Sequence, residues 1–141
     1  MTIKAIQEEL IDEFAMFDDW MQRYEYMIDL GKSLPLIDEQ NKTDDNIIKG
    51  CQSKVWLDAQ LKGDKMVFSA DSDAIITKGI IAVLIRSFNN QTPIAILNAN
   101  TDFIDQIGLK EHLSATRANG LNSMIKKLKL YATAYQAKLN S

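Results

Sequence analysis

A mostly apolar stretch between Ala74 and Phe88 constrains the fold more than any other part of the chain. It follows the polar run Asp71-Ser72-Asp73 and ends at Asn89. Its length of about 14 residues is too great for an ordinary strand, and it therefore predicts a buried helix although isoleucine is frequent in it. The other elements are expected to pack around this helix.

The segment before this helix is typical of a β-hairpin. Residues 53–61 alternate, with Val55, Leu57, Ala59 and Leu61 on one face, and residues 65–71 form a second strand-like run after the turn at 62–64. Trp56 falls on the opposite face, so both faces of the hairpin could be covered. Two strands alone are marginally stable, and we expect a third short strand whose place the sequence does not give.

Helical spacing dominates the rest of the chain. A first helix is predicted from Ile3 to about Phe14, with Thr2 as its N-cap. A second runs from about Asp19 to Leu30, with Asp18 or Asp19 as cap and Gly31 at the position after its end. Together they form a helical hairpin.

Three further helices are predicted in the C-terminal third. Thr92-Pro93 begins one, with Pro93 at the first helical position. A short one spans about 102–107 and stops at Gly108. The last runs from about Leu121 to Leu139, and residues 114–120 are expected to form a turn-like approach to it.

This order of elements predicts an α+β fold, in which a small antiparallel β-sheet of about three strands is flanked by the N-terminal helical hairpin and the C-terminal helices. The 141 residues contain no internal repeat and no linker rich in Pro, Gly or Ser. We expect one domain spanning residues 1–141.

Composition excludes several classes of function. Sixteen basic and 19 acidic residues give a net charge of −3, which does not favour a nucleic-acid-binding protein. The longest apolar run, Ile80 to Ile85, is far shorter than the roughly 20 residues that cross a bilayer. The N-terminus does not look like a secretory signal, and a single cysteine favours a reducing, cytoplasmic setting.

Few residues remain for chemistry, because phosphate-binding glycine loops, H-E-x-x-H and C-x-x-C are all absent. With one cysteine and one histidine, a closed zinc site of four such ligands cannot form within one chain. Cys51 stands before a predicted strand, Gly50 permits a sharp turn, and Lys49 and Lys54 would favour its thiolate. The alternative is a small buried apolar residue at the start of a strand.

Two other residues are candidates. Arg117 lies just before the predicted last helix, where its charge opposes the helix dipole, so Asp73 or a bound anion is a candidate partner. A solvated arginine is the alternative. His112 could pair with Cys51 in a thiol enzyme. The alternative is that His112 is a residue at a helix end or on the surface without a role in catalysis.

The segment from Gly50 through Cys51 to Trp56, together with motifs before and after it, resembles the SufE/CsdE family of sulfur acceptors in iron–sulfur cluster assembly. The most specific part of the resemblance is Gly50-Cys51-Gln52-Ser53-Lys54-Val55-Trp56. Further matches cover almost the whole length of the chain: Trp20, Tyr24, residues 30–35, Ile48-Lys49, residues 70–74, Lys78-Gly79 and residues 112–121. One departure is Ala115, where many relatives have proline.

The resemblance implies a fold similar to the IscU-type scaffolds and a role as a sulfur carrier. Cys51 would take persulfide sulfur from a cysteine desulfurase of the SufS/CsdA type, stimulate that enzyme and pass sulfur to a scaffold of the SufBCD type. Gly50, Gln52 and Ser53 would shape the cysteine loop. Asp73 and Arg117 match positions around the loop and the docking surface. The pyridoxal phosphate would belong to the desulfurase, and this chain would hold no cofactor or metal of its own.

The residues themselves are compatible with a persulfide relay, because the chain has one cysteine. A second, resolving cysteine would divert the sulfur into a disulfide. Gly50 and the long preceding loop suggest that Cys51 is sheltered in the free chain and extended when docked. Two alternatives remain: an adaptor without sulfur chemistry, and an independent enzyme that uses Cys51 and His112. A cluster scaffold is a weaker third alternative, because one cysteine per chain is too few for a four-thiolate site unless chains pair. The sequence allows a monomer or a homodimer.

Overall fold

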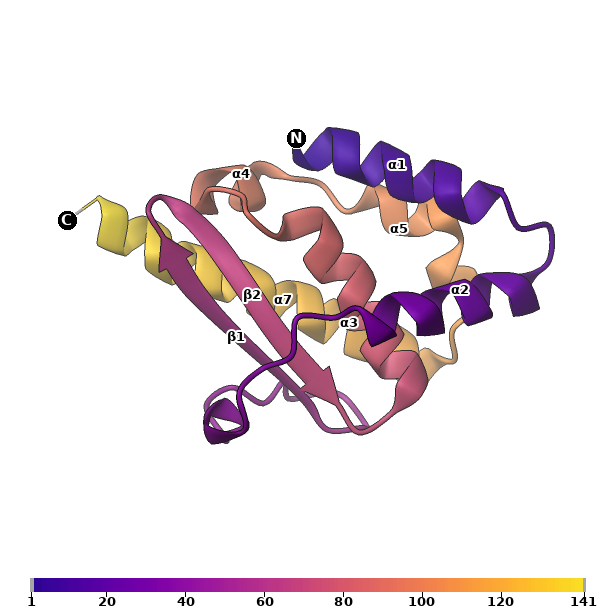
Figure 1. Cartoon of the computed structure of the whole chain (residues 1–141), viewed down its shortest axis with the longest axis horizontal. Helices are drawn as coiled ribbons and strands as arrows, with labels where there is room; N and C mark the ends of the chain where they lie inside the picture. Colours follow the sequence, from indigo (N-terminus) through magenta and orange to yellow (C-terminus); the bar gives the residue numbers. More distant parts are fainter. Residues whose placement is uncertain (1, 141) are drawn as a thin grey trace.

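The computed structural model describes residues 2–140, with Lys110 described by its backbone alone. It is an α+β fold in which one β-hairpin lies beside a set of helices, as the sequence predicts (Figure 1). In chain order the longer elements are α1 (Ile3–Ala15), α2 (Trp20–Lys32), β1 (Val55–Lys62), β2 (Lys65–Ser72), α3 (Ile75–Phe88) and α7 (Ala115–Leu139). Short elements fill the gaps: the 3-10 turn Glu39–Asn41, α4 (Pro93–Asn98), α5 (Asp102–Ile107) and α6 (Leu109–His112).

The predicted helix starts are confirmed where a side chain caps the helix. The hydroxyl of Thr2 accepts from the backbone N–H of Ala5, and the Asp19 carboxylate accepts from that of Gln22. Thr92 caps α4 in the same way. These caps satisfy donors that the first helical turn leaves unpaired, and they are local in sequence, which is why the sequence indicates them.

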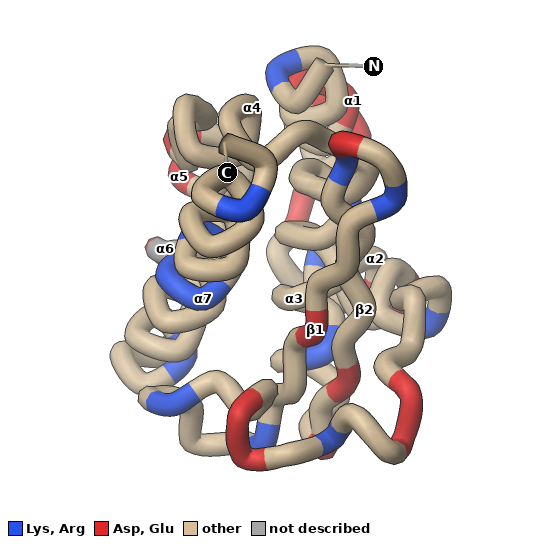
Figure 2. Tube along the Cα trace, turned by 90° about the vertical axis from the view of Figure 1, so that its left-hand side faces the viewer, with Lys and Arg blue, Asp and Glu red and all other residues tan. Residues whose placement is uncertain are grey.

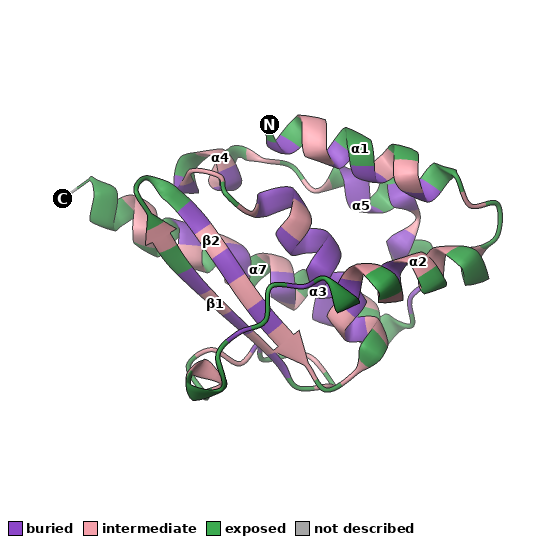
Figure 3. Ribbon diagram, viewed as in Figure 1, coloured by how far each residue is buried: buried purple, intermediate pink, exposed green. Residues whose placement is uncertain are grey.

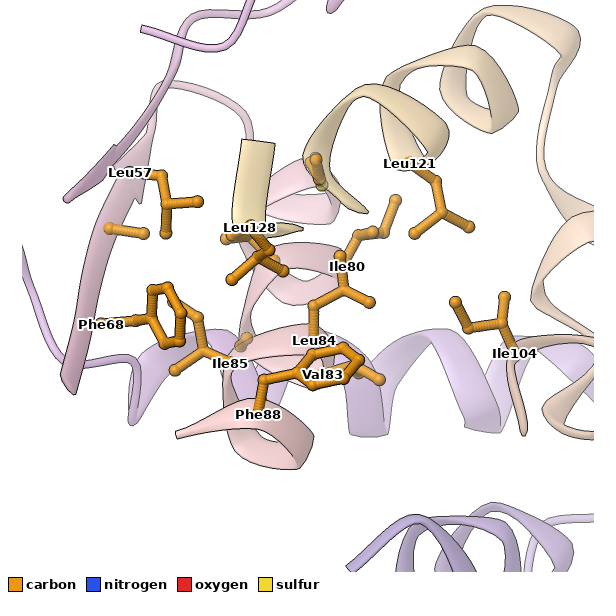
Figure 4. Packing of buried hydrophobic residues seen from close by; sticks show 14 of the residues in the cluster. Leu57, Phe68, Ile80, Val83, Leu84, Ile85, Phe88, Ile104, Leu121 and Leu128 are labelled. Atoms are coloured by element: carbon orange, nitrogen blue, oxygen red, sulfur yellow. The ribbon is translucent and has the colours of Figure 1, made fainter. Parts of the chain in front are cut away.

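The buried helix is also confirmed, because ten of the 14 residues of α3 are buried. Figure 3 shows α3 as the most continuously buried helix, whereas α1 exposes one side to solvent. One face of the hairpin, made by alternate residues including Leu57 and Phe68, packs toward α3 and α7 (Figure 4). The centre of the core therefore lies between the hairpin and these two helices.

The prediction of a third strand is wrong, since the sheet of the described chain has the two strands β1 and β2 in antiparallel register. Isolated bridges and side chains take the place of a third strand. Along the outer edge of β2, Ala70 pairs with the segment 35–37, the Phe68 N–H donates to the Asn89 side chain, and Met66 pairs with residues 90–91.

The outer edge of β1 is covered in a similar way. Ile48 donates its N–H to the Val55 carbonyl, and the hydroxyls of Tyr131 and Tyr135 donate to the carbonyls of Leu57 and Ala59. An unpaired strand edge is a template for aggregation, and these contacts remove much of it without another strand.

Two helix boundaries differ from the prediction. The last helix begins at Ala115, six residues earlier than expected, with Ser114 as its N-cap, so Arg117 and Gly120 lie inside it. Gly31 does not follow the end of α2 but lies within it, buried against Gly79 of α3. A glycine at that position permits close helix packing, and this tertiary contact accounts for it.

Basic residues occur at intervals along α7, with Arg117 near its start and lysines from its middle onward (Figure 2). Within the described part of the chain, no helix is long and apolar enough to cross a membrane.

Candidate functional site

Cys51 lies in a short loop, residues 49–54, that is closed at its base by backbone pairing. Ile47 forms a bridge with Trp56, and the N–H of Ile48 donates to the Val55 carbonyl at 2.8 Å. Because the chain is held on both sides of the loop, the position of the cysteine is set by the fold and not by the loop alone.

Asp73 anchors the C-terminal end of this loop. Its Oδ1 accepts from the backbone N–H of Lys54 at 3.1 Å, and its own N–H donates to the Lys54 carbonyl at 3.2 Å. The Ser72 hydroxyl donates to the same carbonyl at 2.9 Å. The junction between β2 and α3 therefore fixes the end of the cysteine loop.

The sulfur of Cys51 points toward α7. It is half-buried, and its thiol donates to the carbonyl oxygen of Gly120 at an Sγ–O distance of 3.6 Å. Burial raises the pKa of the Cys51 thiol. The expectation that Lys49 and Lys54 favour the thiolate is wrong, because both lysines are exposed and burial is the cause that acts on the pKa. The free chain accordingly favours the protonated thiol, which is the form that donates to Gly120.

Two glycines make this placement possible. Gly50 has a φ of +93°, and a Cβ at that position would lie 2.6 Å from the Ser123 hydroxyl. A Cβ on Gly120 would lie 3.3 Å from the Cys51 sulfur. The loop and α7 therefore approach each other more closely than residues with side chains would permit.

A cavity of about 80 Å³ opens beside the sulfur. Residues 51–53 line it from the loop, Thr77 and Ile80 from α3, and Thr116 and Arg117 from α7. This volume exceeds the roughly 10–15 Å³ that one water needs. The cavity therefore has room for a further atom on the cysteine.

The structure brings together several of the residues that the sequence singles out. Cys51, Gln52, Ser53 and Arg117 all line the cavity, and Gly50 supports the loop. Asp73 does not pair with Arg117: its carboxylate is engaged by the Lys54 backbone, and the exposed Arg117 guanidinium forms no ion pair within residues 2–140.

His112 lies elsewhere. Its ring stacks on that of Trp20 with a centroid distance of 4.0 Å, and its carbonyl accepts from the Tyr24 hydroxyl. It does not line the cysteine cavity, so the geometry does not favour a pair of Cys51 and His112. Across the described chain, three or more His, Cys, Asp or Glu side chains nowhere gather in a group that could hold a metal ion.

Two residues at the site, Thr77 of α3 and Gly120 of α7, are not indicated by the sequence as site residues. The signal for Thr77 is a hydroxyl near the start of a mostly apolar stretch. Gly120 is typical of the turn-like approach expected for residues 114–120, and the structure places it inside α7.

Comparison with known proteins identifies the family. The model of the SufE family, described as an Fe-S metabolism associated domain, matches residues 8–132. The chain belongs to the SufE family. Its role therefore lies in Fe–S metabolism, as the resemblance of the Cys51 segment implies.

Curated relatives support the same assignment. An uncharacterised SufE-like protein of Rhizobium meliloti (strain 1021) is 41% identical over 127 residues, covering 86% of this chain and 91% of the relative. One of Rhizobium etli is 41% identical over 131 residues, covering 89% and 88%. One of Synechocystis sp. (strain PCC 6803) is 35% identical over 128 residues, covering 91% and 80%.

A solved structure supports the fold. The solution structure of a hypothetical protein from Thermus thermophilus superposes with a TM-score of 0.79, covers 94% of this SufE-family chain and 96% of its own, and is 16% identical. At that identity the likeness extends to the fold alone.

Proposed function

We propose that this SufE-family protein is a sulfur carrier that takes persulfide sulfur from a cysteine desulfurase onto Cys51, stimulates that enzyme and passes the sulfur to an iron–sulfur scaffold. The observation that carries the proposal is the position of the chain's one thiol. Hydrogen bonds hold the loop of Cys51 on both sides. The sulfur borders a cavity large enough for a second sulfur atom.

The transfer step needs one thiolate and no redox partner. The Cys51 thiolate attacks the outer sulfur of the desulfurase persulfide, an S–S bond forms to Sγ, and the donor's S–S bond breaks. The desulfurase cysteine leaves as a thiolate. The transferred outer sulfur keeps its proton. The pyridoxal phosphate that releases sulfur from free cysteine belongs to the partner.

Because burial raises the pKa of Cys51, the thiol must be converted to the thiolate before this step can occur. Thiolate is the nucleophile, so the thiol must leave its contact with Gly120 or lose its proton when the partner docks. Gly50, with its positive φ, is a point at which the loop can change course. A carrier that reacts only when docked loses less sulfur to other thiols.

Docking would use the exposed surroundings of the loop. Lys49, Lys54 and Arg117 are exposed, and Ile75 at the start of α3 is 68% exposed. The partners we propose are a desulfurase of the SufS/CsdA type and a scaffold of the SufBCD type, in the cytoplasm, with this chain as a monomer or homodimer.

Intact mass tests the proposal. The chain is incubated with a candidate desulfurase and free cysteine, and its mass is measured with and without reductant. We expect a species one sulfur atom heavier that reductant removes and that Cys51→Ser does not form. An unchanged mass, with binding to the desulfurase confirmed, would leave the chain an adaptor; stimulation that survives Cys51→Ser would point the same way.

A further inference from the structure

Thr77 is buried, and its hydroxyl is unused. The residue is 8% exposed, and its side chain makes no hydrogen bond within the described residues 2–140. The hydroxyl is not fully shut off from solvent, since among the described residues the fully buried side-chain N or O atom without a partner is Trp20 Nε1. A free hydroxyl on the wall of the cavity is available as a donor to a group placed in that cavity.

Three hydroxyls further along the helices behave differently, whereas that of Thr116, in the first turn of α7, also makes no such bond in the described chain. Those of Ser87, Ser123 and Thr133 donate to the backbone carbonyl three or four residues earlier, at 3.0, 3.1 and 2.9 Å. This local bond is the usual one for serine and threonine in a helix. Thr77 does not make it, so its donor remains free.

The position of Thr77 suggests what its partner is. It is in the first turn of α3, and it lines the same cavity of about 80 Å³ as Cys51. The N-terminus of α3 has no side-chain cap, and the first turn of α7, which Ser114 caps, borders the cavity through Thr116 and Arg117. The positive ends of two helix dipoles favour a negative charge between them.

The resting thiol does not need Thr77, because its hydrogen already goes to the Gly120 carbonyl. A thiolate, or the ionised outer sulfur of a persulfide, carries no hydrogen and accepts hydrogen bonds. The free donor in the cavity therefore matches the sulfur in its reactive forms.

We propose that the Thr77 hydroxyl is the hydrogen-bond donor for anionic sulfur in this cavity, both for the Cys51 thiolate and for the outer sulfur of a Cys51 persulfide. This assignment rests on the proposed function for its biological meaning. Thr77 forms and breaks no covalent bond; it binds and orients the sulfur.

The test compares Thr77→Val, which keeps the shape and removes the hydroxyl, with Thr77→Ser, which keeps the hydroxyl. The isolated chain is alkylated with iodoacetamide across a pH series, and the rate at Cys51 is followed by intact mass. Loss of a donor to the thiolate raises the thiol pKa. We expect the Thr77→Val profile to move up by about one pH unit, about tenfold in rate at neutral pH, while Thr77→Ser follows the wild type.

A second arm addresses the persulfide without a desulfurase. Sodium polysulfide loads the chain: the Cys51 thiolate attacks a polysulfide sulfur, the S–S bond beyond it breaks, and a shorter polysulfide leaves. Alkylation of the outer sulfur is then followed across the same pH series, and we expect the same upward shift in Thr77→Val.

Each outcome decides something. Identical profiles for Thr77→Val and wild type overturn the assignment, and a shift for the thiol without one for the persulfide overturns its second half. Equal plateau rates at high pH and equal thermal midpoints show that the loop and fold are intact; if Thr77→Val does not fold, Thr77→Ala carries the same prediction. Both arms remain readable if the desulfurase delivers no sulfur, so failure of the proposed function is distinguishable.

Discussion

Around Cys51, small changes in side-chain volume control how far the sulfur is buried. The thiol fits against α7 because residue 120 has no side chain, and burial in that position raises the thiol pKa. The sequence identifies Cys51 and its loop, yet the expectation of a thiolate favoured by lysines is wrong. Charge near a residue in sequence does not lower a pKa when the side chains extend into solvent and the thiol turns inward.

Gly120→Ala tests this relation at the residue scale. The new Cβ would lie 3.3 Å from the sulfur, so the cysteine must move outward by a few tenths of an ångström. We expect faster alkylation of Cys51 at neutral pH, severalfold, because exposure lowers its pKa toward the ordinary value. Alanine also has a higher helix propensity than glycine by about 1 kcal/mol, so stability should not fall. A slower alkylation rate, measured by intact mass, would contradict this.

At the scale of elements, caps and periodicity are local, and the sequence predicts them well. The starts of α1, α2 and α4, the hairpin and α3 are all found where the pattern places them. The third strand and the start of α7 are not. Strand edges in this fold are satisfied by contacts such as that between Tyr131 and Leu57, 74 residues apart, and no periodicity encodes such contacts.

Tyr131→Phe tests the closure of the β1 edge. The hydroxyl lies 2.8 Å from the Leu57 carbonyl and 2.6 Å from Oδ1 of Asn46, and its loss should lower the free energy of unfolding by about 1 kcal/mol. Urea unfolding at neutral pH measures this, and an unchanged stability would contradict it.

The same tyrosine predicts a pH dependence. Burial raises the pKa of Tyr131 to about 12, above the ordinary value of 10.0. Between these values the native chain holds the proton and the unfolded chain releases it, so stability falls as pH rises through this window. We expect a shallower fall in Tyr131→Phe, measured by urea unfolding at pH 7 and near pH 11. Parallel pH profiles would contradict this.

Ala115→Pro tests the observed start of α7. Ala115 is exposed at the first helical position, and Ser114 before it has an extended ψ of 160°, which a following proline requires. We expect stabilisation by about 0.4–1 kcal/mol, because proline restricts the unfolded chain. The matched control is Ala118→Pro, which removes an N–H bonded to the Ser114 carbonyl at 2.9 Å and should cost about 3 kcal/mol. Thermal unfolding distinguishes the two; equal effects would contradict the helix start at Ala115.

At the scale of the whole molecule, a rigid core holds a less protected reactive loop. α3 is buried along most of its length, and the Glu13 carboxylate joins α1 to Arg86 of α3 and to Tyr26 of α2. In contrast, none of the amides of residues 49–53 donates a hydrogen bond within the described chain. Local opening is expected where such bonds are few.

Hydrogen exchange measured by mass spectrometry tests this contrast. We expect the amides of residues 49–53 to exchange many-fold faster than those of α3, whose exchange should follow global unfolding. A docked desulfurase should change exchange in residues 47–53 and leave α3 unaltered. Loop protection equal to that of α3, or unchanged by a bound partner, would contradict a loop that moves on docking.

The sequence by itself determined the hairpin, most of the helices, the α+β class, the single thiol and the resemblance to the SufE family, because caps, periodicity and short motifs depend on residues that are near neighbours along the chain. The tertiary structure decided how far Cys51 is buried, that its pKa is raised, and that Thr77 lines the same cavity. The reason is distance along the chain. Cys51 meets Gly120 across 69 residues, and only packing around α3 brings the loop, the start of α3 and α7 to one place.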